Sequence, residues 1–238
     1  MDLSIVIPVF NEVECIGPLL DEIDMCLAAE PGFEIIVVDD GSIDGTAAVL
    51  QAARQSCPGL RILHHRECYG QSAAIASGVQ AASKQWIATL DGDGQNDPAD
   101  ILKLYRIMDE SPDDVHMVAG YRKQRVDGWL KRTASRIANA VREAVLHDNS
   151  PDSACGLRIF ARTTFLNLPR FDHMHRFLPA LVQRQGGKVL SVEVNHRKRL
   201  RGQSKYGIHN RLWVGIVDLL GVRWLQRRGR QPVVSEIR

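Results

Sequence analysis

The segment TLDGDGQNDP, residues 89–98, predicts where a strand of the fold ends and where a divalent metal binds. Side chains two residues apart in an extended chain point to the same side, so Asp91 and Asp93 can converge on one cation. Gly92 lacks a Cβ, which lets a ligand approach the backbone closely. Mg²⁺ or Mn²⁺ fills its other positions with water and substrate phosphates, so two carboxylates suffice. The same pattern is also typical of an ordinary polar turn between a strand and a helix.

Around this segment, short apolar runs alternate with stretches of helical periodicity. Continuous apolar runs are typical of strands buried on both faces, and they lie at residues 3–9, 33–38, 61–63 and 86–90. Helices are expected at about residues 16–27, from 44, at 70–83 and from Pro98, the last of them capped by Asp97. Leu90 is expected to face the core. This alternation predicts an α/β fold with a mostly parallel central sheet and helices on both faces.

Polar clusters follow three of the predicted strands, at the edge of the sheet where such folds bind ligands. They are Phe10-Asn11-Glu12, Asp39-Asp40 and Asp91-Gly92-Asp93. Carboxylates at a strand end can accept hydrogen bonds from the base and ribose of a nucleoside. No G-x-G-x-x-G follows the first strand and no G-x-x-x-x-G-K-[ST] occurs, so dinucleotide-binding and P-loop folds lose their main support. A nucleotide site of another kind is therefore predicted.

Charge is divided unevenly along the chain. Residues 1–114 contain 6 Lys and Arg against 20 Asp and Glu, whereas residues 115–238 contain 24 against 8. An acidic half can hold a cation, and a basic half can hold phosphates, an anionic membrane surface or nucleic acid. Attraction between the two halves, or solubility, is the simpler alternative. The 5 cysteines form no C-x-x-C pair, so neither a disulfide framework nor a zinc site is indicated and a reducing cytosol fits.

Motifs of the first half resemble the nucleotide-binding half of family 2 glycosyltransferases. They are IPVFNE (7–12), VVDDGSIDGT (37–46), YGQSAAIASG (69–78) and LDGDGQNDP (90–98). The Asp-x-Asp-x-Gln variant is that of dolichyl-phosphate mannose synthases and bacterial polyprenyl-phosphate glycosyltransferases. Cys68 departs from the family, since many members carry Asn there, and this weakens any polar role for the position. The resemblance implies a glycosyltransferase A-type fold in one domain, 1–207, with a nucleotide-sugar and metal half at 1–97 and an acceptor half at 98–207.

The second half carries the rest of the resemblance. Residues 120–131 match G-x-R-x-x-R-x-D-x-x-x-K of the polyprenyl-phosphate branch, and PDSACGLRIF (151–160) resembles the family's acidic segment before a strand. Residues 175–207 add an apolar helix, the strand KVLSVEV (188–194) and a cationic loop. By itself, each group of basic side chains is equally typical of a solvated surface. Nucleic-acid binding is the other alternative, and the scarcity of aromatic residues between these charges disfavours it.

Site residues follow from the resemblance, position by position. It implies a nucleotide-sugar site formed by Pro8, Phe10, Glu12, Val38, Asp40, Asp91, Gly92, Asp93, Arg122, Arg199 and Lys205. It implies a metal held by Asp91, Asp93 and Gln95. An acceptor phosphate is expected on Arg122, Arg125, Lys131, Arg132 and Ser135. Catalytic roles fall to Asp93, Asp152, Arg199 and Lys205, with Asp152 the candidate base if the acceptor is a hydroxyl.

Residues 208–238 form a basic tail that begins with a predicted amphipathic helix. One stripe of it carries Trp213, Ile216, Val217, Leu220 and Trp224, and Arg223, Arg227, Arg228 and Arg230 flank the stripe. The apolar stretch is shorter than the roughly 20 residues that a membrane span needs, and Asp218 interrupts it. Such a helix can lie in the headgroup region of a membrane. Packing on the core, contact with a second copy in a homodimer, or contact with a membrane-protein partner are alternatives.

The resemblance implies inverting transfer of a sugar from GDP-mannose or a UDP-sugar to a polyprenyl phosphate lipid, with Mg²⁺ or Mn²⁺. The enzyme is expected to be cytoplasmic, attached peripherally to the inner face of the membrane. A soluble transferase acting on a glycan hydroxyl is the first alternative. A nucleic-acid-binding or nucleotidyl-transferring protein is the second, although PVFNE lacks the Gly-rich loop of nucleotidyltransferases.

Overall fold

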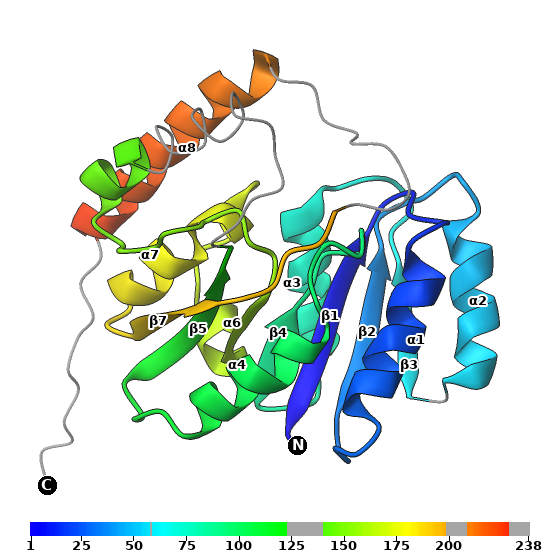
Figure 1. Cartoon of the computed structure of the whole chain (residues 1–238). Helices are drawn as coiled ribbons and strands as arrows, with labels where there is room; N and C mark the ends of the chain where they lie inside the picture. The colour runs from blue at the N-terminus through cyan, green and yellow to red at the C-terminus, as the bar shows by residue number, and fades with distance from the viewer. Residues whose placement is uncertain (58, 123–139, 199–208, 229–238) are drawn as a thin grey trace, which may run out of the picture.

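A computed structural model describes residues 1–57, 59–122, 140–198 and 209–228. In this part of the chain, seven strands form one sheet in the order β3-β2-β1-β4-β6-β5-β7 (Figure 1). The strands are β1 (Leu3–Val9), β2 (Glu34–Asp39), β3 (Leu60–His64), β4 (Trp86–Thr89), β5 (Val115–Tyr121), β6 (Arg158–Ala161) and β7 (Lys188–Glu193). The helices are α1 (Ile16–Leu27), α2 (Thr46–Ser56), α3 (Gln71–Ala81), α4 (Ala99–Asp109), α6 (Arg162–Leu166), α7 (Leu178–Arg184) and α8 (His209–Arg228), with the 3₁₀ turn η1 (Met174–Phe177).

The sheet is parallel except for β6. Strands β3, β2, β1 and β4 pair in parallel, as do β5 and β7, whereas β6 runs antiparallel to both β4 and β5. The predicted mostly parallel α/β sheet is therefore confirmed. The sequence did not predict that one strand reverses, and this reversal brings the residues before β6 to the carboxyl end of β4.

Alternating side chains of β1 belong to two hydrophobic layers, one on each face of the sheet. Ile5 and Ile7 lie in the layer that also contains residues of α1 and α4, and Val6 lies in the layer that contains residues of α3 and α7. Continuous apolar runs are expected for strands that are covered on both faces. Both faces carry helices in Figure 1, as the sequence predicted.

The chain leaves β4 earlier than we expected. This strand ends at Thr89, and Gly92 and Asp93 form a turn, so the prediction of an extended chain from Asp91 to Asp93 is wrong. Leu90 is fully buried, as predicted. Pro98 precedes α4 instead of opening it, while an Asp97 carboxylate oxygen accepts a hydrogen bond from the Ala99 backbone N–H at 3.0 Å.

Helix α8 confirms the predicted tail helix but turns a different side to the protein. Leu219, Val222 and Leu225 pack into the layer that contains α7. The predicted stripe instead faces outward, and its side chains are exposed at Val217 (67%), Leu220 (60%) and Trp224 (58%). The side chain of Trp213 lies outside the described part of the structure. No helix among the described residues is long and apolar enough to cross a membrane.

Candidate active site

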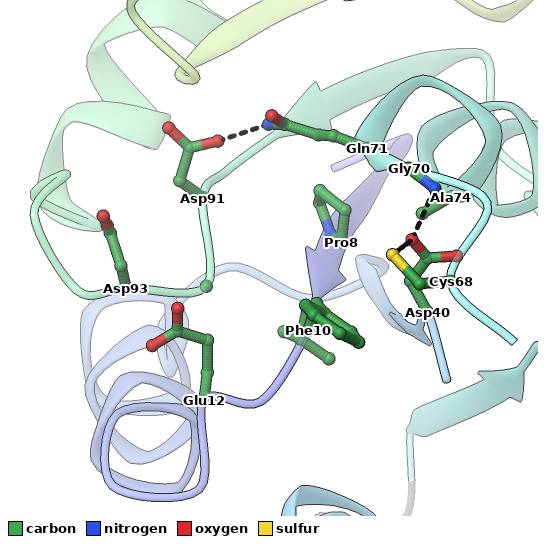
Figure 2. A pocket seen from close by; sticks show the side chains of 12 residues that line it. Pro8, Phe10, Glu12, Asp40, Cys68, Gly70, Gln71, Ala74, Asp91 and Asp93 are labelled. Atoms are coloured by element: carbon green, nitrogen blue, oxygen red, sulfur yellow. Dashed lines mark hydrogen bonds between the residues drawn. The ribbon is translucent and has the colours of Figure 1, made fainter. Parts of the chain in front are cut away.

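A cavity of about 310 Å³ opens at the carboxyl ends of β1, β2 and β4 (Figure 2). Pro8 of β1 lines it together with residues that follow the ends of the three strands: Phe10 and Glu12 after β1, Asp40 after β2, and Asp91, Gly92 and Asp93 after β4. Most of the predicted nucleotide-sugar residues therefore meet in one place. Val38 does not join them, because its side chain is fully buried in the core within β2 and does not line the cavity.

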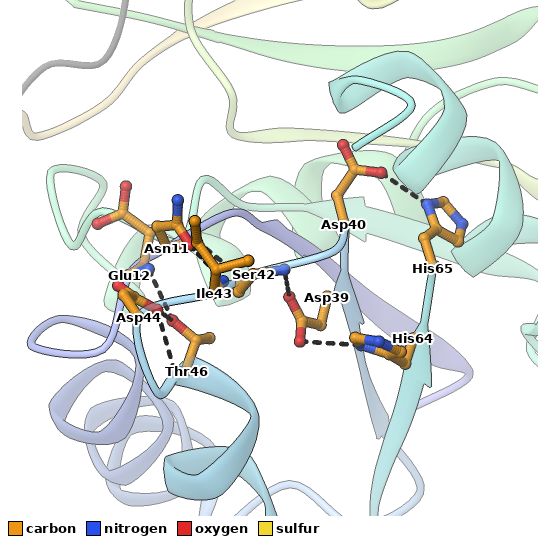
Figure 3. Close-up of polar contacts among 10 residues, drawn as sticks. All are labelled: Asn11, Glu12, Asp39, Asp40, Ser42, Ile43, Asp44, Thr46, His64 and His65. Atoms are coloured by element: carbon orange, nitrogen blue, oxygen red, sulfur yellow. Dashed lines mark hydrogen bonds and ion pairs between the residues drawn. The ribbon is translucent and has the colours of Figure 1, made fainter. Parts of the chain in front are cut away.

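The loop after β1 is pinned to the loop after β2 (Figure 3). Asn11 takes the left-handed conformation, with φ 54°, and its side-chain oxygen accepts a hydrogen bond from the Ile43 backbone N–H at 2.7 Å. The backbone N–H of Glu12 donates to Thr46 Oγ1 at 2.9 Å. Asn adopts this conformation more readily than most residues. These contacts fix the positions from which Phe10 and Glu12 reach the cavity.

Asp40 is an ionised carboxylate on the wall of the cavity, held by donors from residues 65–70. Its oxygens accept hydrogen bonds from His65 Nδ1 at 2.7 Å, the Tyr69 N–H at 2.9 Å and the Gly70 N–H at 2.7 Å. Burial alone would raise the pKa of Asp40, but these donors lower it below its usual value. Asp40 is therefore held ionised, as an acceptor for the N–H or hydroxyl groups of a nucleoside must be.

Cys68 keeps a polar role, although we expected a cysteine to weaken any polar role at this position. Its Sγ donates a hydrogen bond to Asp40 Oδ2 at 3.2 Å, and the side chain lines the cavity beside it (Figure 2). Burial and the neighbouring carboxylate raise the pKa of the thiol, which keeps the proton that makes this hydrogen bond. The cysteine thus takes a donor role toward the same carboxylate.

Ionisation of Asp91 is opposed by burial and by the charge of a neighbouring carboxylate. Burial, and then the charge of Asp93, raise the pKa of Asp91 from 3.8 to about 6, against the opposing effects of Arg158, Arg122 and the Gln71 hydrogen bond. Gln71 Nε2 donates to Asp91 Oδ1 at 2.8 Å (Figure 2). A divalent cation between Asp91 and Asp93 would remove the repulsion that raises this pKa. The donor set therefore fits a hard cation.

The other predicted metal ligand is turned toward a different partner. Gln95 Nε2 donates to the backbone oxygen of Arg197 at 3.3 Å, while the Gln95 N–H donates to Asp93 Oδ1 at 3.1 Å. Among the described residues, no group of three or more His, Cys, Asp or Glu side chains could hold a metal by itself. A cation here would thus take its remaining ligands from water and from a bound diphosphate.

The segment after β7 is anchored beside this loop. The Arg197 guanidinium forms ion pairs with Asp97 at 2.7 Å and with Glu22 at 2.6 Å, and the Arg197 N–H donates to the Gln95 backbone oxygen at 2.9 Å. The chain that leads into the predicted cationic loop therefore starts next to the carboxylate pair. The predicted residues Arg199 and Lys205 of that loop lie outside the described part of the structure, as do Arg125, Lys131, Arg132 and Ser135.

Arg122 and Asp152 form a bidentate ion pair near the carboxyl end of β5. Arg122 Nε donates to Asp152 Oδ2 at 2.6 Å, and Nη2 donates to Oδ1 at 2.9 Å. The side chain of Asp152 is 5% exposed. Such a pair holds both groups in one orientation. The predicted phosphate contact Arg122 is therefore positioned by the residue that we predicted as a candidate base.

A second cavity of about 400 Å³ lies on the other side of Asp91. Both cavities share the residues Pro8, Gln71 and Asp91. The reversed strand β6 supplies the far wall, where Thr89 pairs with Arg158 and Thr89 Oγ1 donates to the Gly156 backbone oxygen at 2.7 Å. No sequence motif predicted a site role for the residues that complete this cavity, which include Gly156, Arg158, His175 and Arg176.

Gly156→Ala is expected to disable the metal site, because an added Cβ would lie 2.2 to 2.4 Å from the carboxyl atoms of Asp91. Displacing Asp91 should weaken Mn²⁺-dependent UDP or GDP binding by about tenfold or more, measured by calorimetry, with the protein still folded. Gly59→Ala is the matched control, since a Cβ there meets nothing within 4 Å. Unchanged Mn²⁺-dependent affinity in the Gly156 variant would contradict the geometry.

Asp91→Asn is expected to stabilise the metal-free protein above about pH 6. The pKa of the carboxyl group is 3.8 in a free side chain and about 6 in the fold, so the folded state binds this proton more tightly. The stabilisation that the fold gains from binding this proton is therefore lost as the pH rises from about 4 to 6. The loss is at most about 3 kcal/mol, and less where solvent screens the charge.

Urea unfolding in EDTA, at about pH 4 and about pH 7.5, measures this contribution. The variant should exceed the parent in stability only at the higher pH. An equal difference in the free energy of unfolding between variant and parent at both pH values would show that ionisation of Asp91 does not destabilise the fold.

Comparison with known proteins places this geometry in a family. Residues 4–168 match the sequence profile of Glycosyl transferase family 2. The chain is 34% identical over 238 residues to a dodecaprenyl-phosphate galacturonate synthase of Rhizobium johnstonii, covering 98% of this chain and 69% of the relative. It is 35% identical over 210 residues to an undecaprenyl-phosphate 4-deoxy-4-formamido-L-arabinose transferase of Serratia proteamaculans, covering 87% of this chain and 63% of the relative. The chain thus spans less than two thirds of the second relative.

Solved structures show the same fold at lower sequence identity. Mannosyl-3-phosphoglycerate synthase from Rubrobacter xylanophilus superposes with a TM-score of 0.75 at 17% identity, covering 99% of this chain and 79% of that one. A mannosyltransferase from Pyrobaculum calidifontis, in complex with GDP-Man and Mn²⁺, gives 0.69 at 19% identity, covering 97% and 66%. The resemblance inferred from the motifs is confirmed, and the chain belongs to glycosyl transferase family 2.

Proposed function

We propose that this glycosyltransferase moves a sugar from a nucleoside diphosphate to a polyprenyl phosphate, with inversion and with Mg²⁺ or Mn²⁺. One observation carries the proposal: two cavities meet at Asp91, so a nucleotide in the first would direct its sugar into the second. The named relatives support a polyprenyl phosphate as the acceptor.

Binding of the donor uses residues that already point into the first cavity. Asp40, held ionised by its donors, would accept hydrogen bonds from the nucleoside. Asp91 and Asp93 would hold the cation, which when bound neutralises the charge that grows on the departing diphosphate. Gln71 keeps the Asp91 carboxylate in place through its 2.8 Å hydrogen bond. The predicted contacts of Arg199 and Lys205 with the diphosphate stay predictions.

The state of Asp152 favours a phosphate acceptor over a glycan hydroxyl. A hydroxyl acceptor needs a base to remove its proton, and Asp152 was the candidate. Both oxygens of this carboxylate accept hydrogen bonds from Arg122, so acting as a base would disrupt the ion pair. An acceptor phosphate has a second pKa of about 6 and arrives already ionised. Asp152 then serves by orienting Arg122.

A peripheral membrane contact fits the outward face of α8. Val217, Leu220 and Trp224 form an exposed apolar stripe, while Leu219 and Val222 fix the opposite side to the protein. Arg227 and Arg228 are exposed at the end of the helix. An apolar stripe beside cations fits the surface of an anionic bilayer, where each basic residue contributes about 1 kcal/mol. We propose this surface as the membrane contact of an enzyme attached peripherally to the cytoplasmic face, where the anionic lipids of that leaflet would attract its arginines.

Transfer is tested directly with undecaprenyl phosphate and labelled nucleotide sugars in the presence of Mn²⁺. The wild-type protein should form a labelled lipid from one donor, and EDTA should abolish the product. Asp93→Ala should lose at least about a hundredfold in rate, since the charge of the leaving group would go unbalanced. Transfer to a glycan hydroxyl, with no lipid product from UDP-galacturonate, UDP-glucose or GDP-mannose, would contradict the proposal.

The membrane contact is tested by sedimentation with anionic liposomes. Leu220→Ser combined with Trp224→Ser should reduce the bound fraction severalfold, because burial of both side chains in the bilayer is lost. Met25→Ser is the control, since Met25 is 79% exposed on α1. Equal binding of both variants and the parent would rule out α8 as the contact.

A further inference from the structure

The second cavity contains a histidine for which neither the resemblance nor the proposed function supplies a role. His175 lines this cavity together with Asp91, Gln71 and Arg158. If the nucleotide occupies the first cavity, as the proposed function requires, the sugar at the end of the diphosphate reaches the second cavity past Asp91. The polar groups of its lining then meet the sugar hydroxyls or their substituents.

His175 is held by a residue 103 positions earlier in the chain. Ser72, at the start of α3, has its hydroxyl oxygen 2.7 Å from His175 Nδ1 and accepts a hydrogen bond from the His175 backbone N–H at 3.2 Å. Arg158 donates to the backbone oxygen of His175 and, at 2.6 Å, to that of Ser153. Side chain and backbone of His175 are thus fixed from two sides.

These hydrogen bonds also favour one of the two tautomers of the ring. Since Ser72 Oγ already accepts from a backbone N–H, its own proton is satisfied when the hydroxyl donates to Nδ1. The proton of the neutral ring then sits on Nε2. Nε2 has no hydrogen-bond partner among the described residues, and His175 lines the cavity. A sugar in the cavity would therefore face an N–H donor.

The ring stays neutral around physiological pH. Burial, followed by the charges of Arg158, Arg176 and the neighbouring His173, lowers the pKa of His175 well below 6.5. A group with such a pKa neither shuttles protons near pH 7 nor adds charge to the site. It is suited to recognition, because a positioned neutral donor distinguishes ligands by the acceptor that they present.

We propose that His175 is a specificity-determining residue that donates a hydrogen bond from Nε2 to the donor sugar. Ser72 is its positioning residue, because the hydroxyl fixes both the ring orientation and the tautomer. The alternative is a purely structural link between α3 and η1. That link would leave the discrimination between a nucleotide sugar and its parent nucleotide unchanged when the ring is replaced.

The test compares two dissociation constants for each variant in Mn²⁺, measured by calorimetry. The probes are UDP-galacturonate, UDP-glucose and GDP-mannose, each compared with its parent nucleotide, UDP or GDP. The variants are measured with the one pair whose sugar nucleotide the wild type binds best. His175→Phe keeps a planar ring without the donor and should weaken the sugar nucleotide about tenfold, with the parent nucleotide within about twofold. His175→Gln retains an N–H donor and should recover most of the loss.

Two further variants control for general damage to this turn and for poor folding of His175→Phe. His173→Asn is the matched control, because His173 lies in the same turn but bonds Asp218 on α8 at 3.1 Å, and Asn tolerates its left-handed φ of 63°. Ser72→Ala removes the orienting hydroxyl without touching the ring and should give an intermediate loss, even if His175→Phe folds poorly. Urea unfolding of each variant reports its folding.

The outcomes separate this proposal from the proposed function. Equal loss of affinity for the sugar nucleotide and its parent, or no loss in His175→Phe, would overturn the role of His175. Normal discrimination without transfer to undecaprenyl phosphate would overturn the acceptor and leave the role of His175 standing. If the wild type binds none of the nucleotides, both proposals fall.

Discussion

The structure of the site depends on one constraint, the ionised carboxylate of Asp91 between two cavities. Burial and the charge of Asp93 act against its ionisation, and among the described residues only Gln71 donates a side-chain hydrogen bond to it, at 2.8 Å. A protein that kept this arrangement for stability alone would gain by replacing the charge. The arrangement is explained if a cation and a diphosphate complete it, since these remove the repulsion that the fold maintains.

The sheet topology creates this constraint. Parallel β1, β2 and β4 deliver Phe10, Asp40 and Asp91 to one edge. Antiparallel β6 then brings the preceding loop to the same edge, where Gly156 packs against Asp91 and Arg158 spans to the carbonyls of Ser153 and His175. Because β6 is reversed, the carboxyl end of β4 is closed on one side, and Asp91 lies between two cavities. The first cavity suits a nucleotide, and the second suits what the nucleotide carries.

Local patterns predicted the elements well, and the pairings between distant segments poorly. Apolar runs identified β1, β2 and β4, and the motifs identified Asp40 and Asp91. The contact of Ser72 with His175 joins residues 103 apart, which no periodicity encodes. The orientation of α8 was left open by the sequence for another reason: both its sides are apolar, so Leu219 and Val222 compete with Val217 and Leu220 for the same pattern. Packing against the rest of the protein decides between them, and the helix itself does not.

The most direct test of this account is the position of the metal itself. Crystals grown with Mn²⁺ and UDP or GDP, measured with anomalous diffraction, should show one strong peak about 2.0–2.3 Å from carboxylate oxygens of both Asp91 and Asp93, with the diphosphate on its other side. Nucleotide bound in the first cavity without such a peak, or a peak held by other residues, would contradict the account.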